Sequence, residues 1–232
     1  MNWKKKIPSP LKLKVNYFIS KSNLSDFLGR FAPAKMFSYI DSEVESNFWS
    51  LVHVERDAQI QRGTLLHINK LYDGAQICIG ERVFIGQNCY FSSGELIEIG
   101  RDSLVGASCN FLGAGHEYHD PTMPYAKAKV VSYGRIILEP NTWIGTGSTI
   151  IGNVRIGFGA VVAANTSVRK SLPPLSLTAG NPAKMLKLFN WITREWEPIK
   201  CQEDELEAVI QEHLKRLPTI EEFINFLDIN IN

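Results

Sequence analysis

Residues 138–168 read LEPNTWIGTGSTIIGNVRIGFGAVVAANTSV, and this stretch decides the fold. An apolar residue returns at every sixth position, beginning with Leu138 and ending with Val168. Two earlier series, within residues 79–91 and 99–111, keep the same period. A period of six matches neither the α-helix nor the simple alternation of a β-strand, so the stretch predicts a repeat architecture.

The residue four positions beyond each apolar residue is small or β-branched in most repeats. These residues are Val83, Cys89, Ser103, Cys109, Thr142, Ser148, Val154, Ala160 and Thr166. Half of the apolar positions are also followed directly by glycine. A parallel β-helix explains the pattern: each face holds a short strand with one large inward residue, and a tight turn follows where glycine tolerates the backbone. The sequence therefore predicts an all-β domain.

Weaker matches at Val54, Ile60 and Leu66 place the start of this domain near residue 52. We expect an N-terminal segment over 1–51 with short helices, the β-helix over 52–181, and a helical tail over 182–232. The period breaks from about residue 112 to residue 135, where glycines, histidines and prolines predict an extruded loop. Long loops on rigid scaffolds commonly carry function.

Within the tail, residues 184–191 are compatible with a short helix. Residues 203–217 place five apolar side chains on one face, which predicts an amphipathic helix. Thr219 and Glu222 form a capping box for a last helix. We expect His213 on the solvated side or the rim of the tail, and we assign it no chemistry.

Composition excludes several classes of function. The 232 residues carry 25 Lys and Arg against 24 Asp and Glu, so no global field attracts nucleic acid or anionic membrane. The lysines at positions 4, 5, 6, 12 and 14 are interpreted as a solvated tail. No apolar run reaches the roughly 18–20 residues that span a bilayer, and residues 1–30 lack a secretory signal. The four cysteines form no CxxC pair, which favours reduced thiols in a cytoplasmic protein with no metal site.

His116 is the leading catalytic candidate, since it follows two glycines in the extruded loop. An imidazole can remove a proton from a hydroxyl nucleophile near neutral pH. Such a base is usually oriented through its other nitrogen, and Glu117 and Asp120 are the nearest carboxylates. The sequence does not choose between these two. His119 is the alternative base.

Two further segments could bind a ligand. Trp143 directly precedes the inward Ile144, so it should point outward, either as a wall beside an acyl donor or as a subunit contact. The segment Ala179-Gly180-Asn181-Pro182-Ala183-Lys184 follows the last repeat. Gly180 would allow close approach of a ligand, and Lys184 offers a positive charge for a phosphate.

These motifs resemble the hexapeptide-repeat acyltransferases, and in particular the maltose, galactoside, nodulation and surface-polysaccharide O-acetyltransferases. The resemblance covers residues 75–188 and rests on the loop around His116, the segment around Trp143 and the closing motif around Gly180. It implies a left-handed β-helix, a homotrimer with active sites between subunits, and acetyl-CoA as co-substrate without a metal.

The same resemblance implies the binding residues. Backbone groups of Gly145, Ala163 and Gly180 would contact the pantetheine, Trp143 would lie beside the thioester, and Lys184 would meet the phosphates. The acceptor would lie near Ser92 and Ser93, where galactoside-type members carry an asparagine. We expect Tyr118 and His119, which follow the candidate base in the loop, to contact the acceptor too.

The sequence thus favours an enzyme that transfers acetyl from acetyl-CoA to a sugar hydroxyl, with a surface polysaccharide or its precursor as the acceptor. The N-acetylation of an amino sugar is an alternative with similar chemistry. A zinc enzyme of the carbonic anhydrase type is disfavoured, because His67, His116 and His119 have the wrong spacing. A non-catalytic binding module would leave the histidine loop unexplained.

Overall fold

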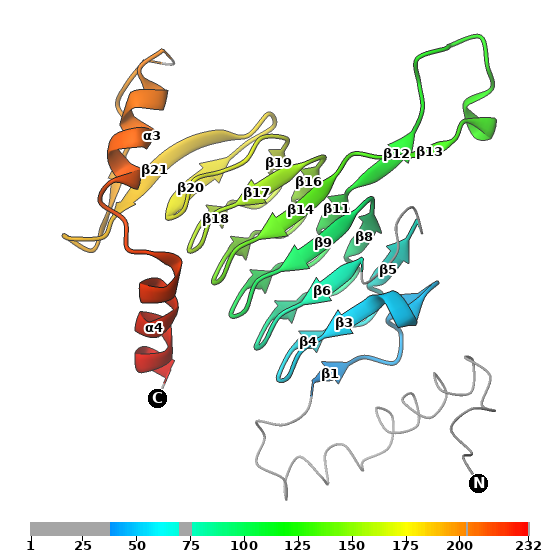
Figure 1. The fold of residues 1–232 in the computed structure, drawn as a ribbon, viewed down its shortest axis with the longest axis horizontal. Coiled ribbons are helices and arrows are strands. Elements are labelled where there is room, and N and C mark those ends of the chain that lie inside the picture. Colours follow the sequence, from blue (N-terminus) through cyan, green and yellow to red (C-terminus); the bar gives the residue numbers. More distant parts are fainter. Residues whose placement is uncertain (1–37, 70–75, 203, 232) are drawn as a thin grey trace, which may run out of the picture.

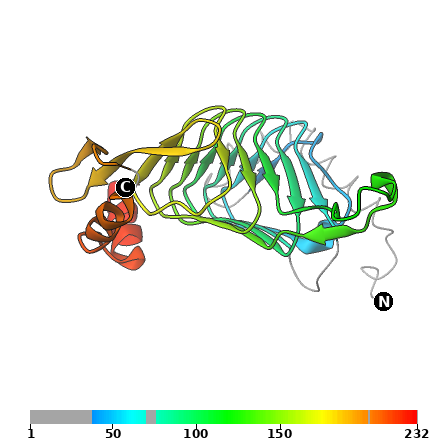
Figure 2. The same cartoon turned by 90° about the horizontal axis from the view of Figure 1, so that it is seen from above.

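The computed structural model describes residues 38–69, 76–202 and 204–231. The chain winds into a column of parallel strands that stack in three sheets, which we call sheets A, B and C. Figure 1 shows the stacked coils along the column, and Figure 2 shows how the coils enclose a common interior. The predicted basic N-terminal tail lies outside the described residues.

Sheet A is the longest sheet, with nine strands. In spatial order it contains β1 (Tyr39–Ile40), β4 (Gln59–Ile60), β7 (Phe84–Ile85), β10 (Leu104–Val105), β15 (Trp143–Ile144), β18 (Val161–Val162), β20 (Ser176–Ala179), β21 (Lys184–Asn190) and β22 (Glu195–Pro198). The strands from β1 to β20 run parallel to one another. Strand β21 then pairs antiparallel with β20, and β22 pairs antiparallel with β21.

Sheets B and C close the other two sides of the column. Sheet B contains β2 (Glu45–Ser46), β5 (Leu65–Ile68), β8 (Tyr90–Ser93), β11 (Asn110–Leu112), β16 (Thr149–Ile151) and β19 (Ser167–Val168). Sheet C contains β3 (Val52–Val54), β6 (Ile77–Ile79), β9 (Leu96–Ile99), β14 (Arg135–Leu138) and β17 (Val154–Ile156). A short 3-10 helix, η2 (Trp49–Leu51), precedes β3.

The interior confirms the six-residue period. Every predicted inward apolar residue is at most 1% exposed: Ile79, Ile85, Phe91, Ile99, Val105, Phe111, Leu138, Ile144, Ile150, Ile156, Val162 and Val168. Neighbouring coils stack identical positions, and the rings of Phe91 and Phe111 lie 4.5 Å apart between centroids. Each coil therefore covers the apolar side chain of the coil below it.

The small residues at the corner between sheets A and B do more than fill space. The Thr64 hydroxyl and the Cys89 thiol each donate to a carbonyl oxygen of the next coil, both at 3.2 Å. The Cys109 thiol and the Ser148 hydroxyl continue this series at 3.3 and 2.9 Å. The hydrogen bond with Cys109 and burial raise the pKa of the Cys89 thiol, which keeps it protonated as a donor. The corner thus links successive coils through buried hydrogen bonds.

The glycines after the inward residues serve a different purpose from the one predicted. A Cβ on Gly86 would stand 2.6 Å from the backbone nitrogen of Ala107, so glycine is needed there because the next coil lies so close. The left-handed turn conformation instead falls two residues later, as at Asn88 with φ 57° and Ser108 with φ 57°. Close stacking and turn geometry are therefore assigned to separate positions of the repeat.

The parallel ladders begin earlier in the chain than the sequence predicts. Tyr39 of β1 pairs with Gln59, and Glu45 of β2 pairs with Leu65. These strands extend the column below residue 52. The lack of a six-residue apolar series in this segment explains why the pattern did not reveal them.

The predicted helix over residues 184–191 is wrong, because this segment is the strand β21. It turns back on β20, with Ala179 opposite Lys184, and then pairs with β22. Leu188 is buried by this antiparallel pairing, so the open edge of sheet A decides the conformation of a segment that has helical propensity.

Two helices complete the tail, α3 (Leu206–Leu214) and α4 (Ile220–Ile231). The capping box at α4 is confirmed, since the Thr219 N–H donates to Glu222 at 2.8 Å and the Glu222 N–H donates back at 3.2 Å. Asp228 accepts hydrogen bonds from Arg82 and Arg101 of the column. His213 is half-buried, which fits a position on the rim of the helix, and its Nε2 lies 2.9 Å from the Pro174 carbonyl oxygen.

Among the described residues, no helix is both long and apolar enough to cross a membrane.

Candidate active site

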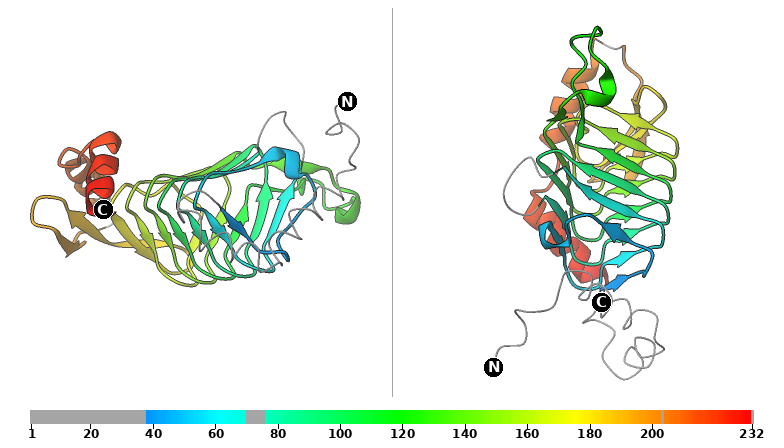
Figure 3. Two further views of the ribbon diagram at one scale, coloured as in Figure 1. Left: turned by 90° about the horizontal axis from the view of Figure 1, so that it is seen from below. Right: turned by 90° about the vertical axis from the view of Figure 1, so that its right-hand side faces the viewer.

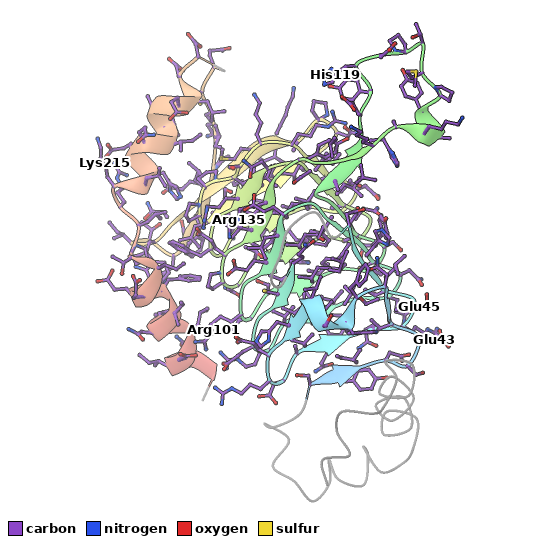
Figure 4. All side chains as sticks on the ribbon, turned by 45° about the vertical axis from the view of Figure 1, so that its right-hand side comes forward. Glu43, Glu45, Arg101, His119, Arg135 and Lys215 are labelled. Atoms are coloured by element: carbon purple, nitrogen blue, oxygen red, sulfur yellow. The ribbon has the colours of Figure 1, made fainter. Side chains whose placement is uncertain are left out.

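Residues 113–134 leave the column as a projecting hairpin, between β11 of sheet B and β14 of sheet C. Its two strands, β12 (Ala114–His116) and β13 (Val130–Ser132), pair antiparallel, and the 3-10 helix η3 (Tyr125–Lys127) lies in the segment between them. Figure 3 shows the hairpin extending beyond the coils, and His119 marks it in Figure 4. The predicted extruded loop is therefore an ordered two-stranded element at its base.

His116 ends β12, opposite Val130, and its side chain is exposed. The imidazole Nδ1 lies 3.0 Å from the carbonyl oxygen of Ala128. A carbonyl oxygen only accepts hydrogen bonds, so Nδ1 must donate and the neutral ring carries its lone pair on Nε2. The backbone thus fixes the tautomer that a general base requires.

Neither of the two carboxylates considered from sequence accepts the Nδ1 proton. Asp120 instead accepts from the Thr122 backbone N–H at 2.9 Å and from its hydroxyl at 2.6 Å. These hydrogen bonds lower the pKa of the Asp120 carboxyl, which therefore organises the loop. Glu117 is exposed, and its backbone N–H donates to the backbone carbonyl oxygen of Lys129 at 2.9 Å.

The tip of the hairpin presents aromatic side chains to solvent. Tyr118 is 66% exposed and stacks on the ring of His119, with 4.9 Å between centroids. Met123 and Tyr125 are also more than half exposed. The hairpin that carries His116 therefore also presents exposed apolar and aromatic side chains.

The two serines predicted to meet the acceptor differ in access. Ser93 is fully buried, and its hydroxyl donates to the Gln76 side chain at 3.1 Å inside the column. Ser92 is 6% exposed and accepts a hydrogen bond from Asn69 at 3.1 Å. Asn69 also donates to the Ser93 carbonyl oxygen at 2.7 Å. An asparagine thus lies beside these serines, one coil below the position expected from the resemblance.

Trp143 points outward from β15, as predicted, and is 51% exposed. It belongs to an apolar stripe along the outer face of sheet A, which consists of Phe84, Leu104 and Trp143 on three successive strands. Gln59 separates this stripe from the exposed Tyr39. The hairpin leaves from the opposite corner, between sheets B and C. Within one chain, His116 and Trp143 therefore lie on different sides of the column.

The backbone N–H groups predicted to meet the pantetheine are already engaged in the column. The Gly145 N–H donates to the Val162 carbonyl oxygen at 2.7 Å, and the Ala163 N–H donates to the Thr178 carbonyl oxygen at 2.8 Å. The Gly180 N–H donates to the Thr166 hydroxyl at 3.1 Å. Their carbonyl oxygens also accept hydrogen bonds within the column, from Cys109, Ser148 and Ser167 respectively, so a ligand donor would share an acceptor that is already engaged through its second lone pair. Lys184, at the start of β21, is exposed.

In the described part of the chain, no three His, Cys, Asp or Glu side chains gather as metal ligands. The four cysteines, Cys78, Cys89, Cys109 and Cys201, carry free thiols. His67 lies on β5 and pairs with Ser92, whereas His116 and His119 lie on the hairpin. His67 thus lies on a different element of the chain from the two hairpin histidines.

Sequence reasoning missed two groups at this site. The Ala128 carbonyl is a backbone group, which residue types do not reveal. Asn69 lies outside the six-residue repeat, so the periodicity did not point to it.

The sequence pattern described as the hexapeptide repeat of succinyl-transferase matches residues 76–109 and 135–170. A putative acetyltransferase of Staphylococcus aureus (strain COL) is 35% identical over 116 residues, which is 49% of this chain and 56% of that protein. A probable macrolide acetyltransferase of Lysinibacillus sphaericus is 36% identical over 114 residues, or 47% of this chain and 61% of that protein. The chain thus matches little more than half the length of these relatives.

Solved structures share the fold over a longer stretch. A hexapeptide-repeat acetyltransferase of Vibrio cholerae is 28% identical, with a TM-score of 0.52, and covers 75% of this chain and 85% of that chain. A variant of AntD, an N-acyltransferase from Bacillus cereus, has a TM-score of 0.54 at 19% identity, over 82% of this chain and 97% of that chain. The repeat pattern and these likenesses confirm the predicted left-handed parallel β-helix.

Proposed function

This chain belongs to the hexapeptide-repeat acetyltransferase family, and from that premise we propose that it transfers acetyl from acetyl-CoA to a hydroxyl group of a sugar. The observation that carries the proposal is the hydrogen bond from His116 Nδ1 to the Ala128 carbonyl oxygen at 3.0 Å. It leaves Nε2 as a proton acceptor on an exposed hairpin.

In this reaction, Nε2 of His116 removes the proton of the acceptor hydroxyl while the oxygen attacks the thioester carbonyl carbon. The tetrahedral intermediate then collapses, the bond between carbon and sulfur breaks, and the imidazolium returns its proton to the departing thiolate. The Ala128 carbonyl stabilises the positive charge on the ring at the intermediate stage. Direct transfer requires no acyl-enzyme.

A second copy of the chain would complete the site. Trp143, which lies on a different side of the column from His116, would come from a neighbouring subunit in a homotrimer. The exposed apolar stripe on sheet A supports such a contact, because monomeric proteins rarely leave a row of large apolar side chains uncovered. Acetyl-CoA would lie in the cleft between subunits, near Trp143, with Lys184 placed to meet a phosphate.

The acceptor class rests on two features. The aromatic side chains of Tyr118 and the stacked His119 offer flat apolar faces of the kind that pack against sugar rings. AntD, which shares the fold, was solved with a nucleotide-linked amino sugar and coenzyme A. We place the acceptor among sugars of a surface polysaccharide or its precursor, near the coil that carries Ser92 and Ser93, both of which are buried within one chain.

The decisive test incubates the protein with acetyl-CoA and matched pairs of acceptors that differ only by a hydroxyl or an amine. Free thiol is measured together with the mass of each product. A product 42 Da heavier from the hydroxyl member, which is the mass an acetyl group adds, supports the proposal. Acetylation of the amine member alone would assign the chain to N-acetylation. Thiol release from neither would refute acetyl transfer to both acceptor types.

A further inference from the structure

The ring of Tyr133 covers Gly115, the residue directly before His116 on β12. A Cβ built on Gly115 would stand 2.0 Å from the Tyr133 hydroxyl oxygen and 2.6 Å from Cζ. Both distances are far inside van der Waals contact, so the phenol ring rests directly on the glycine backbone. Glycine at this position therefore makes room for an aromatic side chain.

Tyr133 itself is held at the base of the hairpin. Its backbone N–H donates to the Gly113 carbonyl oxygen at 2.8 Å. The next residue, Gly134, donates to the Ser132 hydroxyl at 2.9 Å, and the Gly134 carbonyl oxygen accepts from Glu95 of the column at 3.2 Å. The ring thus extends from a point tied to the column and reaches across to β12.

The Tyr133 ring and the His116 imidazole lie on opposite sides of β12. Successive side chains of a strand point to opposite faces, so a residue packed on Gly115 lies across the strand from His116. A two-stranded ribbon is only marginally stable by itself, and this one pairs over three residues. An aromatic ring that presses on its middle residue therefore restrains the strand that carries the base.

We infer that Tyr133 is a positioning residue for His116. Its ring fixes β12, and this keeps the imidazole aligned with the Ala128 carbonyl and Nε2 pointed at the acceptor. The inference rests on the proposed function, because it assigns Tyr133 a task through the general base. The hydroxyl end of the ring makes the contact with Gly115, through Oη, Cζ and Cε2. Because two of these three atoms belong to the ring, Tyr133→Phe should keep most of the packing.

The test compares Tyr133→Ala with Tyr133→Phe, using thiol release from acetyl-CoA with an acceptor or with water. Since displacement of a catalytic group by about 1 Å can cost about 100-fold, Tyr133→Ala should lower kcat by about 10- to 100-fold. The KM for acetyl-CoA should change by less than about twofold, because no binding group is removed. Tyr133→Phe, which keeps the ring, should retain kcat within about threefold. Tyr125→Ala, at an exposed tyrosine of the same hairpin, is the matched control.

The double variant separates positioning from a general structural effect. If Tyr133 acts through His116, then Tyr133→Ala should change the residual rate of His116→Ala by less than about twofold. A further large loss in that background would overturn the inference. Unchanged kcat in Tyr133→Ala alone would also overturn it.

Heteronuclear NMR of the imidazole nitrogens gives a readout that does not depend on turnover. His116→Ala identifies the His116 signals by their disappearance. The wild type and Tyr133→Phe should show the proton on Nδ1, and Tyr133→Ala should show it shared between Nδ1 and Nε2. If His116→Ala retains normal turnover, the proposed function fails, and the NMR comparison still decides whether Tyr133 restrains the ring.

Discussion

The column and the hairpin of this chain differ in how far their side chains are buried and their strands are paired. In the column, the inward residues are at most 1% exposed, and every coil is paired with the coils beside it. The hairpin carries Tyr118, Met123 and Tyr125, all more than half exposed, on a two-stranded ribbon. Stability therefore resides in the repeat, and the candidate chemistry resides where the repeat is interrupted. The difference predicts that mutations in the two regions affect different measurements.

The largest expected effect is on activity alone. His116→Ala removes the proposed general base, and a loss of about 10²- to 10⁴-fold in kcat is expected. The free energy of unfolding should stay within about 0.5 kcal/mol of the wild type, because the side chain is exposed. Steady-state thiol release and urea unfolding provide the two measurements.

His119→Ala is the matched control for His116, since both are exposed histidines of one hairpin. It should raise the KM for the acceptor and leave most of kcat. If His119→Ala abolishes turnover while His116→Ala does not, the roles of the two histidines are reversed.

A substitution in the column should instead have a large effect on stability. Phe111→Ala removes a fully buried ring that stacks on Phe91, and substitutions of this kind cost about 3–5 kcal/mol. The midpoint of urea unfolding should fall accordingly at a fixed protein concentration. Tyr125→Ala in the hairpin should leave it unchanged, and an equal loss there would show that the hairpin also stabilises the fold.

A smaller effect on stability tests whether close packing and turn geometry depend on different residues of one turn. Gly106→Ala places a Cβ 2.6 Å from the backbone nitrogen of Thr146, and overpacking of this kind costs about 1–3 kcal/mol. Ser108→Gly, two residues later, relieves a residue with φ 57°. It should leave stability unchanged or raise it by up to about 1 kcal/mol. Thermal unfolding of both variants measures the contrast, and destabilisation by Ser108→Gly would contradict it.

The smallest effect is a pH dependence confined to the hairpin. Hydrogen bonds from Thr122 hold the pKa of the Asp120 carboxyl below its usual value of about 3.9. Because the folded pKa is depressed, the stabilisation is present above that usual value and is lost as pH falls through the folded value. Protection of the Thr122 amide from hydrogen exchange should decrease in acid while column amides stay protected. In Asp120→Asn, the Thr122 protection should lose this pH dependence.

Sequence reasoning reached the column because side-chain size repeats at a fixed interval, and the packing of each coil depends on that size. It placed His116 on the projecting element for the same reason, since the interruption is visible in the repeat. It failed where backbone groups decide the outcome. The Ala128 carbonyl, the close approach at Gly86 and the edge pairing of β21 are properties of chain geometry, which single residue types do not encode.

The acceptor residues illustrate the same limit. Ser92 and Ser93 are adjacent in the sequence, yet only the Ser93 hydroxyl turns into the column, where it meets Gln76. Because Phe91 was predicted to point inward, the alternation of a strand already assigns Ser93 to the inner side of β8. The hydrogen bonds that Asn69 donates to both serines depend on the pairing of β5 with β8, which the sequence does not show.

The reversal of the chain after β20 has a consequence for assembly. A stack of parallel strands has no intrinsic length, and an uncovered last strand could recruit the first strand of another molecule and grow end to end. Here β21 runs antiparallel to the stack and β22 pairs antiparallel with β21, while the Gly180 carbonyl oxygen and the Ala183 N–H bond to Ser167 at the end of sheet B. The last parallel strand, β20, therefore has its free edge filled by the chain's own β21 and cannot accept a further coil from another molecule.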